Sequence, residues 1–186
     1  MNKILVIDIE TTGFQNQGGA IVEVGAVSLS LGTGEVTTVF DSVCRKDILS
    51  GRHREEPMGW IFKNSSLTVE EAREAPLLPD LLPEIQSIIN NHPLGATAYN
   101  RSFDFNFLQS RGVTFPKALP CPMKLATPVC KLMPMKYGTY KWPSVEEAWK
   151  HFFPDQPYEE LHRGADDARH EALIVWELYR QGIFTL

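Results

Sequence analysis

Two acidic residues interrupt the first strongly apolar stretch of the chain, and they restrict its fold more than any other feature. Residues 3–9 are apolar except for Lys3 and Asp8, and Glu10 follows directly. Residues two apart in a β-strand face the same side, so both carboxylates would lie on one face of a buried strand. Burying two like charges together is costly unless a cation neutralises them. The pair therefore predicts a metal site at the end of this strand.

The apolar pattern along the rest of the chain predicts helices packed on a sheet. Strands that follow the first one are expected at 21–31 and 35–44, joined as a hairpin by a Gly-Thr-Gly turn, and at 94–98. A polar loop is expected at 46–57. Helices are expected at 66–75, at 81–89 with Asp80 as cap, at 103–109, at 124–130 and at the end of the chain, with Gln181-Gly182 as its stop.

Size and cysteine content favour one intracellular domain. With 186 residues, 43% of them hydrophobic, the chain can bury a single core, and we expect residues 1–186 to form one domain. The three cysteines include no Cys-x-x-Cys pair, which argues against a disulfide framework or a structural zinc site and favours a reducing compartment. No signal peptide or segment of membrane-spanning length is expected. We therefore predict a cytoplasmic protein with no membrane partner.

The charge is unevenly distributed along the chain. Residues 111–150 contain seven Lys or Arg and two Glu, a balance of +5, which leaves −10 for the remainder of a chain whose net charge is −5. Such a basic region suits contact with a phosphate backbone. Five residues interleaved with its lysines are candidates for binding a nucleic-acid strand: Met133, Met135, Tyr137, Tyr140 and Trp142. A solvated, lysine-dotted loop is an equally weighted alternative.

Two further acids stand where helices are expected to begin. Asp104 lies at the start of the helix predicted at 103–109, and Asp167 follows His162 by five residues before the last helix. Taken singly, Asp104 could be a helix cap and His162 a surface histidine. Asp166 could equally replace Asp167 as the functional acid.

Together these segments resemble a known enzyme family. The motifs Asp8-Ile9-Glu10-Thr11-Thr12-Gly13, Asn100-Arg101-Ser102-Phe103-Asp104-Phe105-Asn106-Phe107-Leu108 and His162-Arg163-Gly164-Ala165-Asp166-Asp167-Ala168 are similar, in order and spread, to those of the DEDDh branch of the DnaQ-like 3′-5′ exonucleases. The resemblance covers nearly the whole chain. It implies a ribonuclease H-like α/β domain, with a mixed sheet of about five strands flanked by helices.

The resemblance also implies a metal-dependent hydrolase that releases nucleoside 5′-monophosphates from a 3′ end, with a single strand as the expected substrate. Asp8 would bridge two divalent ions, Mg²⁺ or Mn²⁺, Glu10 and Asp167 would hold the ion on the nucleophile side, and Asp104 would hold the other. His162 would be the general base, on a loop that closes over substrate. The H-x₄-D spacing selects Asp167 and leaves Asp166 as a solvated acid of the first turn.

The same motifs contain candidate substrate-binding residues. In the family the turn Thr11-Thr12-Gly13 seats the terminal nucleotide, and Asn100 belongs to the second motif. Phe14 and Phe103 are candidates for base stacking, although Phe103 could instead be core. His170 has no motif partner and is expected at the surface. The chain departs from the family at Tyr99, where histidine is common, and at Gly164, where alanine is usual; neither is a ligand position.

Two other functions remain as alternatives. The domain could be a proofreading-type accessory subunit that docks on a polymerase, or a catalytically silent nucleic-acid-binding module. No motif selects DNA over RNA or defines an oligomeric state. Retention of all five chemical residues favours an active exonuclease.

Overall fold

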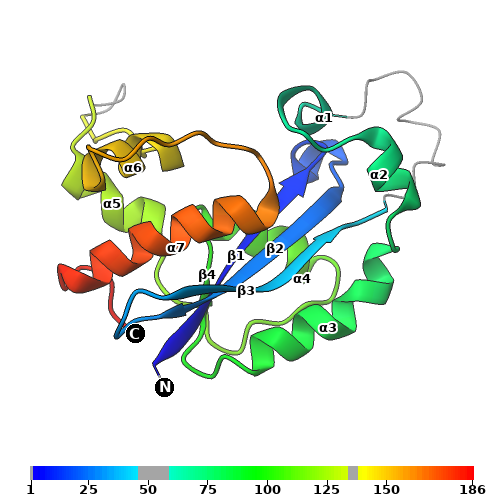
Figure 1. Cartoon of the computed structure of the whole chain (residues 1–186), viewed down its shortest axis with the longest axis horizontal. Helices are drawn as coiled ribbons and strands as arrows, with labels where there is room; N and C mark the ends of the chain where they lie inside the picture. The colour runs from blue at the N-terminus through cyan, green and yellow to red at the C-terminus, as the bar shows by residue number, and fades with distance from the viewer. Residues whose placement is uncertain (1, 46–58, 134–137) are drawn as a thin grey trace.

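A mixed sheet forms the centre of the molecule. The computed structural model describes residues 2–45, 59–133 and 138–186. Its sheet has the order β3-β2-β1-β4 (Figure 1). Strands β1 (Lys3–Thr11), β2 (Ile21–Ser30) and β3 (Val36–Val43) are antiparallel neighbours, and β4 (Ala96–Thr97) runs parallel to β1. The predicted mixed sheet that opens with three consecutive strands is therefore confirmed.

The described residues form four strands, one fewer than the sequence predicted. Beyond β4, pairing is limited to an isolated parallel bridge between Ala96 and Ala118, where the Leu119 N–H donates to the Ala96 carbonyl at 2.8 Å. Pro116 and Pro120 flank this segment and have no N–H to donate. A longer fifth strand therefore cannot form here.

The helices cover both faces of the sheet. They are α1 (Ile61–Asn64), α2 (Val69–Glu74), α3 (Leu78–Asn90), α4 (Arg101–Gln109), α5 (Pro122–Cys130), α6 (Val145–Phe152) and α7 (Gly164–Arg180), with a 3-10 turn η1 at Gln15–Gln17. Sequence analysis did not predict α1 and α6. Within the described ranges, none of these helices has both the length and the apolar character needed to cross a bilayer.

Two predicted helix boundaries have different outcomes. Asp80 does not cap α3, because that helix begins earlier, with Leu77 at the N-cap and Asp80 inside the first turn. The predicted end of α7 is confirmed, since Gln181 is its C-cap and Gly182 has a φ of +70°, which suits glycine. The loop predicted at 46–57 lies outside the described residues.

Alternation along β1 decides which helices its side chains face. Ile4 and Val6 belong to the core cluster formed with α5, α6 and α7, whereas Leu5 and Ile7 belong to the cluster formed with α3 and α4. Residues of even number therefore point toward α7. Asp8 has the same parity, so β1 presents its acid toward the side on which α7 packs.

Candidate active site

The first turn of α7 packs directly against β2 beside Asp8. Asp8 pairs with Gly25 in the sheet, and a Cβ atom on Gly25 would lie 2.0 Å from the carbonyl carbon of Gly164. A Cβ on Gly164 would likewise lie 2.7 Å from the Gly25 nitrogen. Only two glycines allow this approach of backbones. The departure from alanine at position 164 therefore has a steric reason, and the contact sets α7 beside the acids of β1.

Asp104 reaches the same region from the other side of β1. Strand β4 pairs with β1 only at Leu5 and Val6, so the sheet supplies no β4 partner for Ile9. The Ile9 N–H donates instead to Asp104 Oδ1 at 3.2 Å, and Asp104 is 4% exposed. The N-cap of α4 is Asn100, so Asp104 is not the helix cap that was weighed as an alternative.

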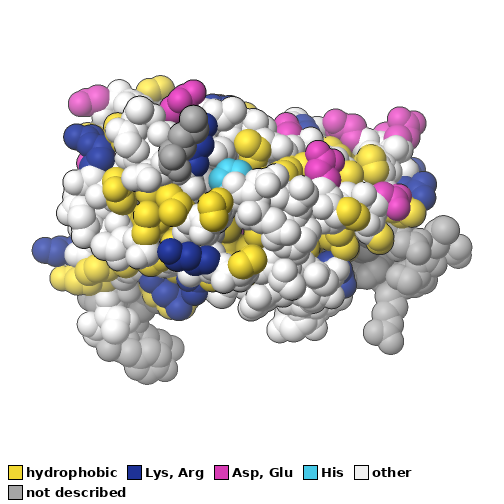
Figure 2. Space-filling model, turned by 90° about the horizontal axis from the view of Figure 1, so that it is seen from below, with side chains coloured by type: hydrophobic (Ala, Val, Ile, Leu, Met, Phe, Trp, Pro, Cys, Tyr) yellow, Lys and Arg dark blue, Asp and Glu magenta, His cyan; other side chains and the backbone are white. Residues whose placement is uncertain are grey.

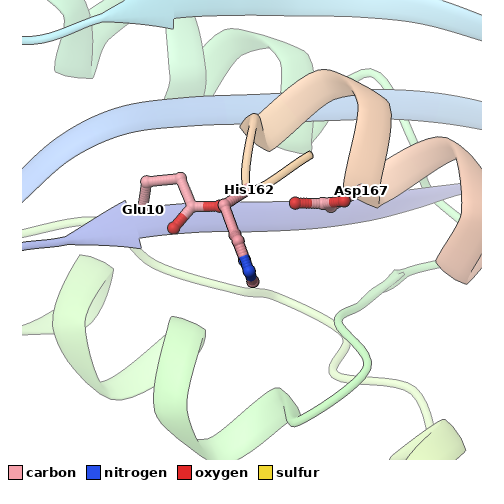
Figure 3. Close-up of side chains that lie close together, drawn as sticks. All are labelled: Glu10, His162 and Asp167. Carbon is pink, nitrogen blue, oxygen red and sulfur yellow. The ribbon is translucent and has the colours of Figure 1, made fainter. Parts of the chain in front are cut away.

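His162 and Asp167 come from the loop and first turn of α7. Asp167 Oδ2 accepts a hydrogen bond from the Arg163 N–H at 3.0 Å, and the side chain is buried. His162 has a φ of +51°, a conformation uncommon for a residue with a side chain. Ligand atoms of Glu10, His162 and Asp167 all lie within 4.8 Å of one another (Figure 3). Strand β1 and the start of α7 therefore meet at this point.

The acids of the cluster repel one another in a buried setting. Burial, followed by the charges of Glu171, Asp104 and other acids, raises the pKa of Asp8 well above its usual value. Burial and neighbouring Asp167 raise the pKa of Glu10 to about 9. Burial also raises the pKa values of Asp104 and Asp167 to about 7. Without a cation, this cluster favours partly protonated carboxyl groups.

Two buried oxygens in the cluster are suited to a metal ion. Asp8 Oδ2 and Asp167 Oδ1 have no hydrogen-bond partner among the described residues. Buried polar atoms in proteins are almost always paired, so such atoms call for an explanation. Carboxylate oxygens are the ligands that hard divalent cations prefer. The donor set therefore fits the predicted metal site.

Glu171 is a further buried acid beside the cluster that sequence analysis missed. It lies four residues after Asp167 in α7, is 4% exposed, and its Oε2 accepts a hydrogen bond from the Tyr99 N–H at 3.2 Å. Burial, followed by the charge of Asp104, raises its pKa well above the usual range. Its i, i+4 spacing from Asp167 is the sequence signal that could have revealed it.

An ion pair between buried Glu23 and partly exposed Arg163 fixes the loop that carries His162. Glu23 of β2 is 1% exposed, and its two carboxylate oxygens lie 3.0 and 3.1 Å from Arg163 Nε. Arg163 also donates to Ser66 Oγ at 3.1 Å. Sequence analysis missed this pair, although one glutamate inside the apolar strand at 21–31 is an available signal. Arg163 thereby connects the start of α7 to β2 and to the segment that precedes α2.

The predicted substrate-binding residues surround the end of β1. Thr11 Oγ1 donates to the Gly13 carbonyl at 3.0 Å, and Thr12 Oγ1 accepts from the Ala20 N–H at 3.0 Å, so the turn is held by its own side chains. Phe14 is 61% exposed and meets Phe103 edge-on at 6.3 Å between ring centroids. Asn100 is exposed at the start of α4.

Two expectations about α7 need correction. His170 is half-buried rather than fully at the surface, since 22% of its side chain is exposed and its ring lies against the rings of Trp149 and Tyr158, with centroids 4.9 and 4.8 Å away. Asp166 is only partly solvated, since its carboxylate lies 3.4 Å from His170 Nδ1 and one of its oxygens is buried. Asp166, Asp167 and His170 form a second group of potential ligands. It shares Asp167 with the first group.

The basic region is described only in part, because Met135 and Tyr137 lie outside the described residues. Met133, Tyr140 and Trp142 are exposed, and the Lys124 ammonium lies 5.9 Å from the centroid of the Trp142 ring. On the face in Figure 2, Lys and Arg lie mostly over the half that carries α5, and Asp and Glu mostly over the half that carries α2. The uneven charge of the sequence is thus visible on the surface.

Sequence comparison finds relatives among exonucleases and polymerases. A family model described as "Exonuclease" matches residues 5–175. A DNA polymerase III PolC-type of Clostridium perfringens is 27% identical over 174 residues, which cover 94% of this chain and 11% of that protein. The PolC-type polymerase of Caldanaerobacter subterraneus is 27% identical over 110 residues, 59% of this chain and 7% of that protein. The chain thus spans about a tenth or less of these relatives' length.

Structural comparison supports the fold. A 3′-exonuclease in a structure of 3′-end-specific recognition of histone mRNA stem-loop gives a TM-score of 0.73 at 16% identity, covering all of this chain and 85% of the other. The nuclease domain of 3′hExo, a DEDDh family member bound to rAMP, gives 0.70 at 16% identity, with 100% and 96% covered. At these identities the comparison shows a shared fold, in agreement with the predicted α/β domain with a mixed sheet flanked by helices.

Proposed function

Because this chain belongs to the exonuclease family whose model matches residues 5–175, we propose that it is a metal-dependent 3′-5′ exonuclease. It hydrolyses phosphodiesters at a free 3′ end of DNA or RNA and releases nucleoside 5′-monophosphates. The observation that carries this proposal is the meeting of four acids from three elements, with buried oxygens on Asp8 and Asp167 that have no hydrogen-bond partner in the described part of the chain.

The four acids would hold two divalent cations, Mg²⁺ or Mn²⁺. Asp8 would contact both, Glu10 and Asp167 the one on the side of the attacking water, and Asp104 the other. When bound, the cations would neutralise the carboxylates, lower the pKa of water and stabilise charge on the leaving 3′ oxygen. The Ile9 N–H fixes one oxygen of Asp104 and the Arg163 N–H fixes one oxygen of Asp167, so each keeps its other oxygen for a ligand.

His162 would accept the proton of the attacking water. Its Nδ1 lies 3.8 Å from Glu160 Oε1, so a carboxylate stands near the ring. The imidazole stands beside Glu10 and Asp167, where the water would have to be held. An imidazole in this place could accept a proton from water held beside the two carboxylates, which suits general-base catalysis.

The nucleic acid would extend from the terminal nucleotide toward the exposed aromatic residues and lysines. Thr11, Thr12, Gly13 and Asn100 would contact the terminal nucleotide, and the exposed Phe14 would stack on a base, supported from the side by Phe103. Farther along the strand, Trp142 with Lys124 would contact bases and backbone. The expected substrate is single-stranded, because stacking needs unpaired bases.

A proofreading role beside a polymerase is the second candidate. A stretch that covers 94% of this chain is similar to part of a PolC-type polymerase, and this similarity favours the proofreading role. In that case the chain would copurify with a polymerase in the cytoplasm. A silent binding module is disfavoured, because all five chemical residues are retained.

The decisive experiment compares degradation of matched single-stranded DNA and RNA oligonucleotides labelled at the 5′ end. Mg²⁺ should support stepwise shortening from the 3′ end, and a chelator should abolish it. Asp167→Asn should lower the rate by at least about a thousandfold, whereas the matched variant Asp166→Asn should stay within a few-fold of wild type. Equal losses in both variants would place the metal ligand elsewhere, and undiminished activity with the chelator would refute the mechanism.

A further inference from the structure

The indole of Trp60, which no motif contains, lies against the imidazole of His162. The two ring centroids are 4.6 Å apart and the rings are nearly perpendicular, at 81°. Edge-to-face contacts of this kind are favourable and fix the relative orientation of two rings. Trp60 is nevertheless 57% exposed, so only part of its surface serves packing. Its position beside the proposed base therefore calls for a functional explanation.

The backbone of Trp60 is fixed on both sides. Gly59 has a φ of +76°, and a Cβ atom there would lie 2.6 Å from both the Cα and the carbonyl oxygen of Thr12. On the other side, Ile61 is 1% exposed in a small core cluster, and Asn64 Nδ2 donates to the Trp60 carbonyl at 2.8 Å. The segment thus rests on the turn that would seat the terminal nucleotide.

The His162 side chain is 20% exposed, and its ring nitrogens have few restraints among the described residues. Its backbone is anchored through neighbouring Arg163, which is bound to Glu23 and Ser66. The imidazole itself forms no hydrogen bond with the described residues, and Glu160 is 3.8 Å from Nδ1. The Trp60 ring is therefore an aromatic contact that limits rotation of the imidazole.

We propose that Trp60 is a positioning residue whose ring holds the His162 imidazole beside Glu10 and Asp167. The inference rests on the proposed exonuclease function, in which His162 accepts a proton. Because Gly59 packs on Thr12, the same segment links the nucleotide-seating turn to the base. A nucleotide seated on that turn would thereby stabilise the placement of His162.

The test measures kcat and KM on a single-stranded oligonucleotide with Mg²⁺ for Trp60→Ala and Trp60→Phe. Trp60→Ala should lower kcat by about ten- to a hundredfold with KM within about twofold, because misplacing a catalytic group affects the chemical step. Trp60→Phe, which keeps an aromatic edge, should recover most of the rate. Trp176→Leu, which removes an indole from the far half of α7, should leave kcat unchanged. The melting temperature of each variant shows that it is folded.

A double-mutant cycle separates positioning from base stacking. In a His162→Ala background, Trp60→Ala should change kcat by less than about twofold, because the group through which it acts is gone. An equal loss in both backgrounds, or an increase in KM with kcat unchanged, would overturn the proposal and assign Trp60 to substrate contact. Neither result would affect the exonuclease function, which depends on Mg²⁺ and Asp167.

A spectroscopic measurement tests the contact without catalysis. In the wild type, the ring current of Trp60 should displace the NMR signals of the His162 imidazole. Trp60→Ala should return them toward the positions of an exposed histidine, with Trp176→Leu as the unaffected control. Unchanged imidazole signals in Trp60→Ala would refute the proposed contact. If the wild-type chain shows the expected ring-current shifts at His162 but has no nuclease activity, the exonuclease function is refuted and the contact is not.

Discussion

At the scale of single residues, the pairing of Glu23 with Arg163 holds the loop that carries His162 and requires a buried charge on Glu23. Glu23 is 1% exposed, and burial raises the pKa of its carboxyl group while Arg163 lowers it. Removing one partner of a buried pair leaves the other charge uncompensated, which is far worse than losing a surface ion pair. The stability of this loop is therefore sensitive to either partner.

Arg163→Met should lower the free energy of unfolding by about 3 to 5 kcal/mol at pH 8, measured by urea denaturation. Glu23 would then be protonated in the folded state, so its pKa would exceed that of the unfolded chain. Stability would fall as pH rises from the unfolded pKa of Glu23 to its folded pKa. The decrease in unfolding free energy caused by Arg163→Met should therefore be smaller at pH 5. Adding Glu23→Gln to this variant should restore part of the lost unfolding free energy, because the unpaired charge is removed. A loss below about 1 kcal/mol, or no recovery in the double variant, would contradict this account.

At the scale of secondary-structure elements, the contact of β2 with the start of α7 positions the active site. Gly25→Ala would place a methyl group 2.0 Å from the carbonyl carbon of Gly164, far inside van der Waals contact, so α7 must move. We expect a loss of at least about 1 to 3 kcal/mol and a decrease in kcat, since His162 and Asp167 move with α7. Thermal unfolding and the oligonucleotide assay measure both effects.

Gly32→Ala provides the matched control for that prediction. Gly32 lies in the hairpin turn after β2, and a Cβ atom there would have no neighbour within 4 Å. It should therefore leave stability and kcat close to those of the wild type. Equal effects of Gly25→Ala and Gly32→Ala would show that the close approach of β2 and α7 is unimportant.

The elements that the sequence predicted well are those with strong local patterns. The apolar run of β1, the hairpin of β2 and β3, and the stripe of α7 indicated their own secondary structure. The short helix α1 has too few residues for a periodic signal, although the capping box Ser144–Glu147 before α6 was readable and was missed. The prediction of a fifth strand was wrong because Pro116 and Pro120 limit pairing beside β4.

The acids of the site were predictable because motif spacing carries them. Their environment was not, since Glu171, Arg163 and Trp60 approach the cluster only after α7 and the segment at 59–64 have packed. Contacts between residues far apart in sequence leave no periodic trace. The ring contacts of His170 with Trp149 and Tyr158 were missed for the same reason.

At the scale of the whole molecule, the acidic cluster makes stability depend on pH and on bound cations. Each of these carboxyl groups has a folded pKa above its unfolded value of about 3.8 for Asp or 4.5 for Glu. Between the two values, the folded state binds more protons than the unfolded chain. Without cations, stability contributed by these groups is present below pH 4 and is lost as pH rises toward about 7 for Asp104 and Asp167 and about 9 for Glu10.

Divalent cations should reverse this loss, because they bind the deprotonated acids of the folded state. We predict that the cation-free protein melts at a lower temperature at pH 8.5 than at pH 6, and that Mg²⁺ raises the melting temperature more at pH 8.5. Asp8→Asn removes one charge from the cluster, so its cation-free form should lose less stability over this interval and gain less from Mg²⁺. Differential scanning calorimetry at matched ionic strength, with Na⁺ replacing Mg²⁺ as the control, measures these shifts. An equal gain from Mg²⁺ at both pH values, or in both proteins, would mean that the cation acts outside the four-acid cluster.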